Sequence, residues 1–274
     1  MEFKQCHFEI EDEMRQLVAL QNEVYKSRGL HFTPSIFKTW YIDNPNGKVI
    51  SFNAFDNGKM VAHQSFVPEE MLVNGRVVKC VRSMAVVTHP DYQRQGLFAT
   101  VTNKALEEAK HQGFEFAYAI TNENSTPVFL KHCGFIQVTQ LQVKIGLSTN
   151  IKESSDYVFK RFWTDEALKW RLNMHNYRRF RNSVIGKYGH GVSTYMATID
   201  DNKLNNVGLD SKKSGFGIYL YIGLGADLPI SYMNMPKFVK RSPFNLIYQD
   251  LTSGKLPTMT SDNVFYQLLD YDVI

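Results

Sequence analysis

The sequence predicts an α+β fold (mixed α/β) in which a mixed sheet is flanked by helices and followed by a smaller C-terminal α+β domain. Three β-rich runs are joined by two strong hairpin turns, Asp56-Asn57-Gly58 and Asn74-Gly75. Beyond residue 96 the apolar period changes from 2 to 3.6 and back, which indicates a strand–helix–strand crossover. A polar run near residue 150 then precedes a region with apolar content of its own.

The elements of the first part follow from this periodicity. Apolar residues at helical spacing predict a helix within residues 11–29 that stops at Gly29, and a short helix is expected from Pro34. The β-rich runs "KVISFNAF", "KMVAHQSFVPEEMLV" and "RVVKCVRSMAVV" should form an antiparallel meander.

A crossover follows the meander. We expect a helix over 97–112, a strand over 114–120, a short helix begun by Thr126-Pro127 and ended by Gly134, and one strand over 135–147. The two strands joined by the long helix should be parallel, with a right-handed connection.

The polar run "STNIKESSD" at 148–156 is interpreted as a linker, so the predicted domains are 1–147 and 156–274. The second domain has a helical stretch, "DEALKWRLNMHNY", and strand-like runs such as "GFGIYLYIGLG" and "FNLIYQDL". A modest α+β domain is expected there.

Composition limits the classes of function. The net charge of +4, from 31 basic and 27 acidic residues, is too small to predict nucleic-acid binding but is compatible with a phosphate-bearing ligand. No apolar run approaches the roughly 18 to 20 residues of a membrane span, and the N-terminus lacks a signal pattern, so we expect a cytoplasmic protein that does not bind membranes. The oligomeric state is left open between monomer and homodimer.

The cysteines do not predict a metal site. Cys6, Cys80 and Cys133 are odd in number, far apart and without metal-ligand spacing. We expect reduced thiols that pack in the interior, and no metal.

The stretch "THPDYQRQGLFATV", residues 88–101, places a glycine at the start of a predicted helix directly after an apolar strand. A helix N-terminus has N–H groups without internal partners and a partial positive charge, so it can bind a phosphate. Gly96 would allow close approach, and Gln93, Arg94 and Gln95 add donors. The alternative is a simple turn in which the glycine only relieves strain.

This stretch resembles the acyl-CoA signature of the GNAT superfamily, which has Gln or Arg, two residues, Gly, one residue, then Gly or Ala. The match is Gln93-Arg94-Gln95-Gly96-Leu97-Phe98; Phe98 departs from the small final residue, although Ala99 follows. "AYAITNENSTPVFLKHCGF" is similar to the family's next strand, turn and short helix. "WYIDNPNGK" and "VAHQSFVPEEM" resemble two-domain members often found in surface-polysaccharide gene clusters.

The resemblance implies a sheet with splayed central strands and acetyl-CoA as co-substrate. The backbone amides of the turn would bind the CoA pyrophosphate, Val86 and Thr88 would pair with the pantetheine, and Asn124 would meet its far end. The implied cofactor-binding residues are Val86, Val87, Thr88, Gln93, Arg94, Gln95, Gly96, Leu97, Phe98, Ala99 and Asn124.

The catalytic groups are less clearly indicated. An amine must lose a proton before it attacks a thioester, because its ordinary pKa is about 10.4. Candidate bases are His63 and either Glu69 or Glu70, each of which also fits a structural role. The N–H of Val86 or Val87 could stabilise the oxyanion. The family's frequent Tyr acid is replaced by Leu130.

For the acceptor we name Trp40, Asn44, Tyr118 and Arg171 as candidate contacts, with packing, turn or anchoring roles as alternatives. The leading hypothesis is an N-acetyltransferase for a small-molecule amine, a nucleotide-linked amino sugar. The basic stretch 161–187 disfavours a polycationic acceptor. The alternatives are an aminoglycoside or protein amine acetyltransferase and a non-catalytic acyl-CoA-binding protein.

Overall fold

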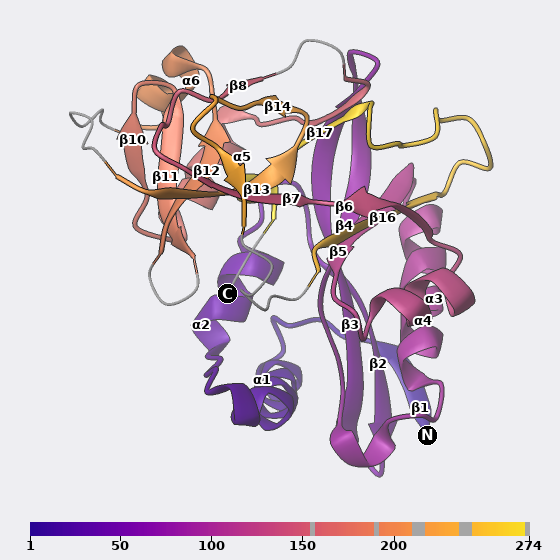
Figure 1. Cartoon of the computed structure of the whole chain (residues 1–274). Helices are drawn as coiled ribbons and strands as arrows, with labels where there is room; N and C mark the ends of the chain where they lie inside the picture. The colour runs from indigo at the N-terminus through magenta and orange to yellow at the C-terminus, as the bar shows by residue number, and fades with distance from the viewer. Residues whose placement is uncertain (154–156, 189–191, 210–216, 236–242, 272–274) are drawn as a thin grey trace. The chain divides into compact units, whose positions relative to one another are not determined.

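The computed structural model describes residues 1–153, 157–188, 192–209, 217–235 and 243–271 (Figure 1). The chain forms two compact units, and neither is a single stretch of sequence. The first unit consists of Met1–Glu70, Val78–Gln137 and Ile247–Thr258; the second consists of Met71–Val77, Val138–Leu246 and Met259–Ile274.

The sheet of the first unit has the strand order β1-β2-β3-β4-β5-β16-β6. The strands are β1 (Glu2–Gln5), β2 (Ile50–Asp56), β3 (Lys59–Val73), β4 (Arg76–Thr88), β5 (Phe116–Thr121), β6 (Ile136–Gln140) and β16 (Asn245–Asp250). The ends of β3, β4, β6 and β16 extend into segments of the second unit. The sequence did not predict β1, which pairs antiparallel with β2.

Both predicted hairpins are confirmed. Asn57 and Gly58 have φ of 48° and 81°, and Asn74 and Gly75 have φ of 50° and 76°. Two consecutive positive φ angles are what a tight hairpin needs, because they match the right-handed twist of the paired strands.

The predicted parallel crossover is also confirmed. Strand β4 leads through α3 (Leu97–His111) into β5, and β4 and β5 are parallel. Their pairing covers only Cys80–Arg82 against Phe116–Tyr118. Beyond this point β4 continues to Thr88 and β5 to Thr121. The two central strands are therefore splayed, as the family resemblance implied.

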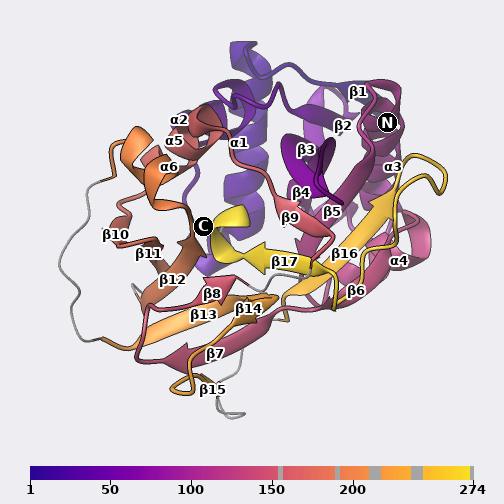
Figure 2. The ribbon, with the colours of Figure 1, turned by 90° about the horizontal axis from the view of Figure 1, so that it is seen from above.

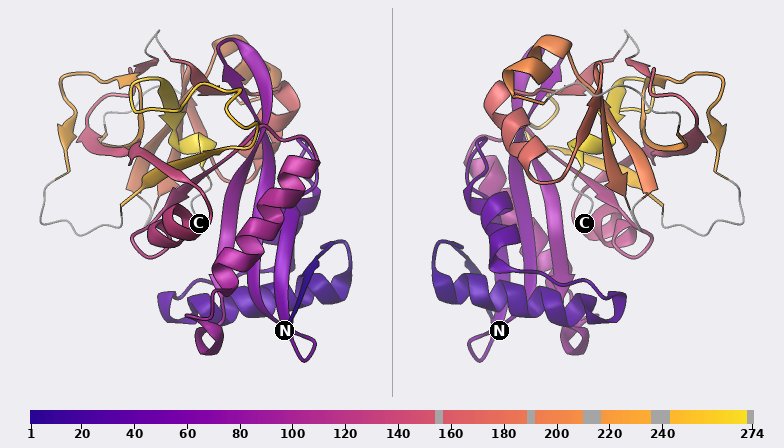
Figure 3. Two further views of the ribbon diagram at one scale, coloured as in Figure 1. Left: turned by 90° about the vertical axis from the view of Figure 1, so that its right-hand side faces the viewer. Right: turned by 90° about the vertical axis from the view of Figure 1, so that its left-hand side faces the viewer.

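Helices cover both faces of this sheet. In Figures 1 and 3, α3 and α4 (Thr126–His132) lie on one side of β2–β5, while α1 (Glu11–Tyr25) and α2 (Pro34–Phe37) lie on the other. The short helices are η1 (Lys26–Arg28), η2 (Lys38–Ile42) and η3 (Pro90–Tyr92). No helix in the described part of the chain is long and apolar enough to cross a membrane.

The alternation of β3 between the two faces positions polar side chains on both. The Gln64 amide oxygen accepts a bond from the Thr102 hydroxyl of α3, at 3.2 Å. Its neighbour His63 contacts Tyr41 of η2 instead. Since successive side chains of a strand point to opposite faces, His63 and Ser65 lie on the α1 and η2 side.

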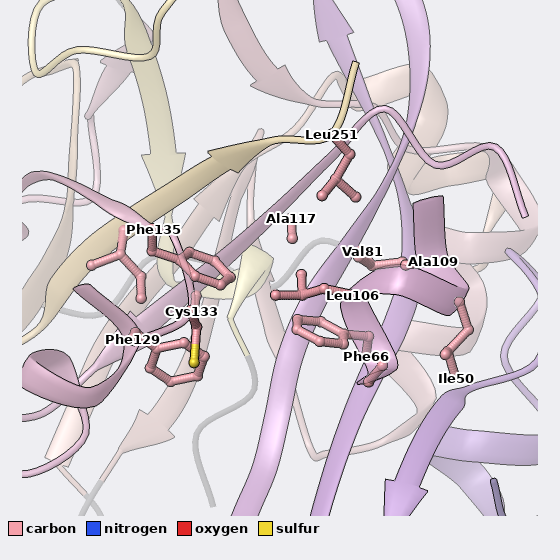
Figure 4. Packing of buried hydrophobic residues seen from close by; sticks show 13 residues of the cluster. Ile50, Phe66, Val81, Leu106, Ala109, Ala117, Phe129, Cys133, Phe135 and Leu251 are labelled. Atoms are coloured by element: carbon pink, nitrogen blue, oxygen red, sulfur yellow. The ribbon is translucent and has the colours of Figure 1, made fainter. Parts of the chain in front are cut away.

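The core between α3, α4 and the sheet is apolar (Figure 4). Leu106 and Ala109 of α3 pack with Phe66 and Val81 of the sheet. Phe129 of α4 connects several aromatic rings, with centroid distances of 5.1 Å to Phe98 and 5.0 Å to Phe135. Ile247 and Leu251 complete the cluster, so a late segment of the chain contributes to the core of the first unit.

The second unit is also built from helices and strands. Strands β10-β11-β12-β13-β17-β9 lie in this order, with the last residues of β3 beside β9 and with β7 and β15 beyond β13 (Figure 2). The elements are β7 (Gln142–Gly146), β8 (Lys152–Glu153), β9 (Phe159–Arg161), α5 (Asp165–Asn173), β10 (Arg178–Phe180), β11 (Ser183–Tyr188), β12 (Val192–Thr198), α6 (Asp201–Asn206), β13 (Tyr219–Leu224), β14 (Ala226–Asp227), β15 (Met233–Asn234), β17 (Val264–Gln267) and η4 (Leu268–Asp270).

Two expectations for this region need correction. The single strand expected over 135–147 is divided into β6 and β7 at Leu141, whose N–H bonds the carbonyl of Phe244. The expected linker is packed at its start, because Ile151 is 1% exposed and belongs to an aromatic cluster of the second unit. Residues 154–156 of that linker, and 215–216 of the run predicted around β13, lie outside the described residues.

We expect Phe129→Ala to lower the free energy of unfolding by about 3 to 5 kcal/mol, because it leaves a cavity between the rings of Phe98 and Phe135. Urea denaturation followed by circular dichroism would measure this. Ile136→Ala is the control, because Ile136 is 47% exposed and should change stability by less than about 0.5 kcal/mol. Equal effects of the two substitutions would contradict the assignment of this core.

Candidate functional site

A buried charged cluster lies where β4 and β5 begin to diverge. Arg82 and Tyr118 form the last pair of the two strands. Glu69 of β3 bonds both, since one carboxylate oxygen accepts from Arg82 Nε at 2.8 Å and the other accepts from the Tyr118 hydroxyl. The three side chains are 5% exposed or less. The cluster therefore fixes the three strands at the fork.

The sequence interpretation named Tyr118 as a candidate contact of the acceptor and Glu69 as a candidate base. It did not name Arg82. Side chains buried in mutual contact at the fork are suited to hold the strands. The signal in the sequence was one acid, one base and one phenol on three successive strands of the expected sheet, but only the register brings them together.

Strand β4 is irregular just past the fork. Ala85 has φ of +55°, an uncommon value for a residue with a side chain. The carbonyl groups on either side of its Cα are both bonded by side chains: Ser65 Oγ donates to the Met84 oxygen at 2.6 Å, and Gln21 Nε2 donates to the Ala85 oxygen at 2.8 Å. The irregular segment is thus held from β3 and from α1.

The remaining residues of β4 border the open side of the fork. His89 N–H donates to the Val61 carbonyl of β3 at 2.8 Å. Since alternate N–H groups of a strand point to opposite sides, Val87 also faces β3, whereas Val86 and Thr88 face the side where β5 has diverged. The Thr88 hydroxyl oxygen is buried and has no hydrogen-bond partner within the described structure.

The turn before α3 presents its backbone to solvent. Arg94 and Gly96 have φ of 61° and 77°, and Gly96 is the N-cap of α3. Residues Gln93 to Gly96 are exposed. The first N–H groups of a helix have no partner inside it, so those that follow Gly96 are available to an anion.

Two side chains predicted as donors to a ligand also form hydrogen bonds within the turn. Gln93 Nε2 and Gln95 Nε2 contact the carbonyls of Thr88 and Asp91, each at 3.4 Å. Tyr92 connects the turn to β2 through a 2.8 Å bond from its hydroxyl to Asp56. These contacts hold the turn in the shape that exposes its amides.

The side chains that follow Gly96 explain the unusual end of the motif. Leu97 is 6% exposed and packs with Ala54 and Val101. Phe98 packs edge-on against Phe129 of α4. An aromatic residue is tolerated there because it fills the space between two helices, while its backbone N–H belongs to the first turn.

The turn after β5 is organised by Asn122 rather than by Asn124. The Asn122 side-chain oxygen accepts from the N–H groups of Asn124 and Ser125, each at 3.0 Å. Asn124 itself is exposed. Sequence reasoning chose Asn124 from the family resemblance, whereas the Asn-x-x-Ser spacing could have indicated the turn.

His63 lies in a buried polar chain and not at a surface. It is 0% exposed, and its Nδ1 contacts the Asn53 side-chain oxygen at 2.6 Å while its Nε2 contacts the Tyr41 hydroxyl at 3.1 Å. Tyr41 contacts Ser65 Oγ at 2.8 Å. Burial lowers the pKa of His63 to about 3, so its ring is neutral at pH 7.

Two predicted acceptor contacts are buried within the first unit. Trp40 is 5% exposed and its ring stacks edge-on with Phe37. Asn44 Nδ2 donates to the Pro68 carbonyl at 3.1 Å, next to Glu69, and its oxygen accepts from Asn46 N–H. Glu70, by contrast, is partly exposed.

Arg171 is an anchor within the second unit. It is 3% exposed, and its guanidinium donates to the carbonyls of Leu269 and Tyr271 at 2.9 and 3.1 Å. It also borders a cavity of about 270 Å³ whose other lining residues include His175, Asn176, Tyr177, Lys187 and Tyr188. None of its lining residues within the described part of the chain is acidic.

The other residues weighed from the sequence have packing roles. Leu130 of α4 packs against the apolar core. Cys6, Cys80 and Cys133 are buried free thiols, and burial raises the pKa of Cys6 to about 12 and that of Cys133 to about 11. The thiols of Cys6 and Cys133 are therefore protonated at pH 7 and poorly nucleophilic.

Solved structures share this fold. They include a GCN5-related N-acetyltransferase from Anabaena variabilis, with a TM-score of 0.58, 11% identity, and coverage of 92% of this chain and 74% of that one. A probable N-acyltransferase from Enterococcus faecalis has a TM-score of 0.62, 10% identity, and coverage of 91% and 72%. Eis1 from Mycobacterium abscessus has a TM-score of 0.55, 9% identity, and coverage of 92% and 74%.

At these identities the structural likeness shows the fold alone, and no protein of curated function matches the sequence. Residues 9–135 match the model of the acetyltransferase (GNAT) domain, a range that includes the fork, the irregular segment of β4 and the turn before α3. Residues 9–135, somewhat less than half of the chain, are therefore similar to the acetyltransferase (GNAT) domain.

Proposed function

We propose that the first unit binds acetyl-CoA between β4 and β5 and transfers its acetyl group to a primary amine. The observation that carries the proposal is the splay of two parallel strands that pair over three residues only. Strands that diverge leave N–H and C=O groups without strand partners, and an extended amide chain such as pantetheine can bond to them.

The residues present fit this co-substrate. Val86 and Thr88 have N–H groups on the open side of β4, and the buried Thr88 hydroxyl can bond the ligand's amides. The turn from Gln93 to Ala99 would hold the pyrophosphate with its N–H groups, and Arg94 adds a positive charge beside it. Asn124, at the turn after β5, stays a proposal for the far end of pantetheine.

The reaction needs a donor for the oxygen that becomes negative. The amine nitrogen attacks the thioester carbon, the C=O electrons move to oxygen, and collapse of this intermediate breaks the C–S bond to release CoA and the amide. Both Val86 and Val87 were candidates for the N–H donor. The alternating directions of the N–H groups of β4 support Val86, because the N–H of Val87 points towards β3.

The group that would protonate the CoA sulfur differs from the one that is usual in the family. Leu130 cannot donate to the sulfur, so we assign that proton to the nitrogen of the intermediate or to water. The burial of His63 disfavours direct contact with an amine, and we retain Glu70 as base, because it is partly exposed and follows Glu69 of the fork in the chain.

For the acceptor we propose a nucleotide-linked amino sugar. Support comes from the sequence resemblance and from the cavity of the second unit, where Arg171 and Lys187 carry positive charge and no acidic residue is found among the lining residues that the structure describes. Such a cavity suits a phosphate group better than a polycation. Trp40 and Asn44 are retained only for their buried packing and turn contacts, and Arg171 only for the charge that it contributes to the cavity.

The acceptor is tested by release of free thiol from acetyl-CoA in the presence of nucleotide amino sugars, aminoglycosides or peptides. We expect turnover with a nucleotide amino sugar, and a rise in KM for this acceptor but not for acetyl-CoA in Lys187→Gln. Preferential turnover of an aminoglycoside or peptide would replace the proposed acceptor. Binding of acetyl-CoA without turnover of any amine would favour a non-catalytic binding protein.

We expect Gly96→Val to weaken CoA binding at least tenfold, because a branched side chain at φ of +77° distorts the turn and covers its amides. Isothermal titration calorimetry with CoA would measure this. Gly113→Val is the matched control, since Gly113 follows α3 with φ of +82° and, as at Gly96, nothing lies within 4 Å of an added Cβ. Equal affinity of the two variants would refute the assigned phosphate site.

The neutral, buried His63 should make the protein less stable in acid. Its pKa is about 3 when folded and about 6.5 when unfolded, so between these values only the unfolded chain binds the proton. Stability from this group is therefore complete above pH 6.5 and is lost as the pH falls. From pH 7 to pH 5, wild type should lose about 2 kcal/mol more unfolding free energy than His63→Gln. Parallel losses in urea denaturation would contradict the assignment.

A further inference from the structure

The two side chains that bond the irregular part of β4 have a geometric consequence for the reaction. Gln21 and Ser65 are both fully buried, and they come from different elements, α1 and β3. Each bonds the carbonyl of one of the two consecutive peptide groups that flank the Ala85 Cα, at 2.8 and 2.6 Å. Side chains rarely need to bond strand carbonyls, because the neighbouring strand normally does so.

A trans peptide group is planar, so its C=O and the following N–H point in opposite directions. The described chain contains no cis peptide. The bond from Gln21 to the Ala85 carbonyl therefore also directs the N–H of Val86, and the bond from Ser65 to the Met84 carbonyl directs the N–H of Ala85. Together the two bonds fix both torsions of Ala85, whose φ of +55° is costly on its own.

The Ser65 bond is itself positioned by a second set of side chains. Ser65 donates to the Met84 carbonyl, so its oxygen is left to accept from Tyr41. Tyr41 in turn contacts His63, and His63 contacts Asn53. Because the Asn53 oxygen can only accept, His63 carries its proton on Nδ1. Its Nε2 and the Ser65 oxygen are then both acceptors facing the Tyr41 hydroxyl, which has one proton and donates it to one of them at a time. The rotamer of Ser65 is thus set by a buried chain of partners.

We infer that Gln21 and Ser65 are positioning residues for acyl transfer, which hold the Val86 N–H at the place where the thioester oxygen becomes negative. This inference rests on the proposed function. Neither residue touches the substrate; each acts through the backbone of β4. Loss of either bond would let the Ala85 segment relax towards ordinary strand geometry and turn the Val86 N–H away, with the phosphate-binding turn unchanged.

The experiment compares Ser65→Ala and Gln21→Met with wild type and with Ser83→Ala. Ser83 is the matched control because it is a buried serine of β4 whose hydroxyl contacts Gln64 at 3.0 Å, on the opposite face and away from the irregular carbonyls. Two quantities are measured with isotope-labelled acetyl-CoA: its dissociation constant and the infrared stretching frequency of its bound thioester carbonyl.

We expect wild type and Ser83→Ala to lower the carbonyl frequency relative to free acetyl-CoA, as a directed N–H donor should. Ser65→Ala and Gln21→Met should lose most of this shift, while the dissociation constant changes less than about threefold. With an identified acceptor, the kcat of these two variants should fall at least tenfold. This loss is smaller than the roughly 10²- to 10³-fold loss that follows when an oxyanion donor is removed outright. Urea denaturation shows that each variant is folded.

The outcomes separate the inference from the function on which it rests. A carbonyl shift that persists in both variants, or that is lost equally in Ser83→Ala, would overturn the positioning role while acetyl-CoA binding stands. No binding of acetyl-CoA by folded wild type would overturn the proposed function itself. If Ser65→Ala does not fold, Gln21→Met and the Tyr41→Phe variant, which removes the partner of Ser65, give the same test.

Discussion

The ionic contact among Glu69, Arg82 and Tyr118 is the constraint on which the first unit depends. It lies at the last residue pair of β4 and β5 and is almost fully buried. A buried ion pair gains little net free energy over apolar packing, but the loss of one partner is costly because it leaves an unpaired charge. Such a contact specifies geometry more than stability, and here it sets where two parallel strands stop pairing.

What lies beyond the fork follows from that position. Once β5 has diverged, β4 no longer has a partner on one side, and its N–H groups there need another acceptor. The irregular Ala85 and the turn before α3 lie between Arg82 and Leu97 in the chain. One end of an extended ligand can therefore bond the turn while its other end reaches Ala85. The length of β4 between these two points sets the distance that the ligand must span.

The sequence predicted the parts of this arrangement that depend on local rules. The two hairpins need positive φ angles that Asn and Gly supply, and the helix after Gly96 has a clear apolar period. The position of Ala85 could not be predicted, because nothing in "SMAVV" marks a positive φ. Its stabilisation comes from Gln21, 64 residues earlier, and a partner at that separation is known only once the chain has folded.

The same reasoning explains why the environments of the polar candidates could not be predicted. His63 and Tyr118 lie in strands and Asn44 lies in the loop after η2, and each is buried with a hydrogen-bond partner. In a sheet with helices on both faces, a polar side chain meets solvent on neither face and must find a hydrogen-bond partner inside. These partners converge on the fork and on the irregular segment of β4. The buried polar residues therefore act on the site through the backbone that they hold, and the groups left to meet a ligand are chiefly N–H groups of the main chain.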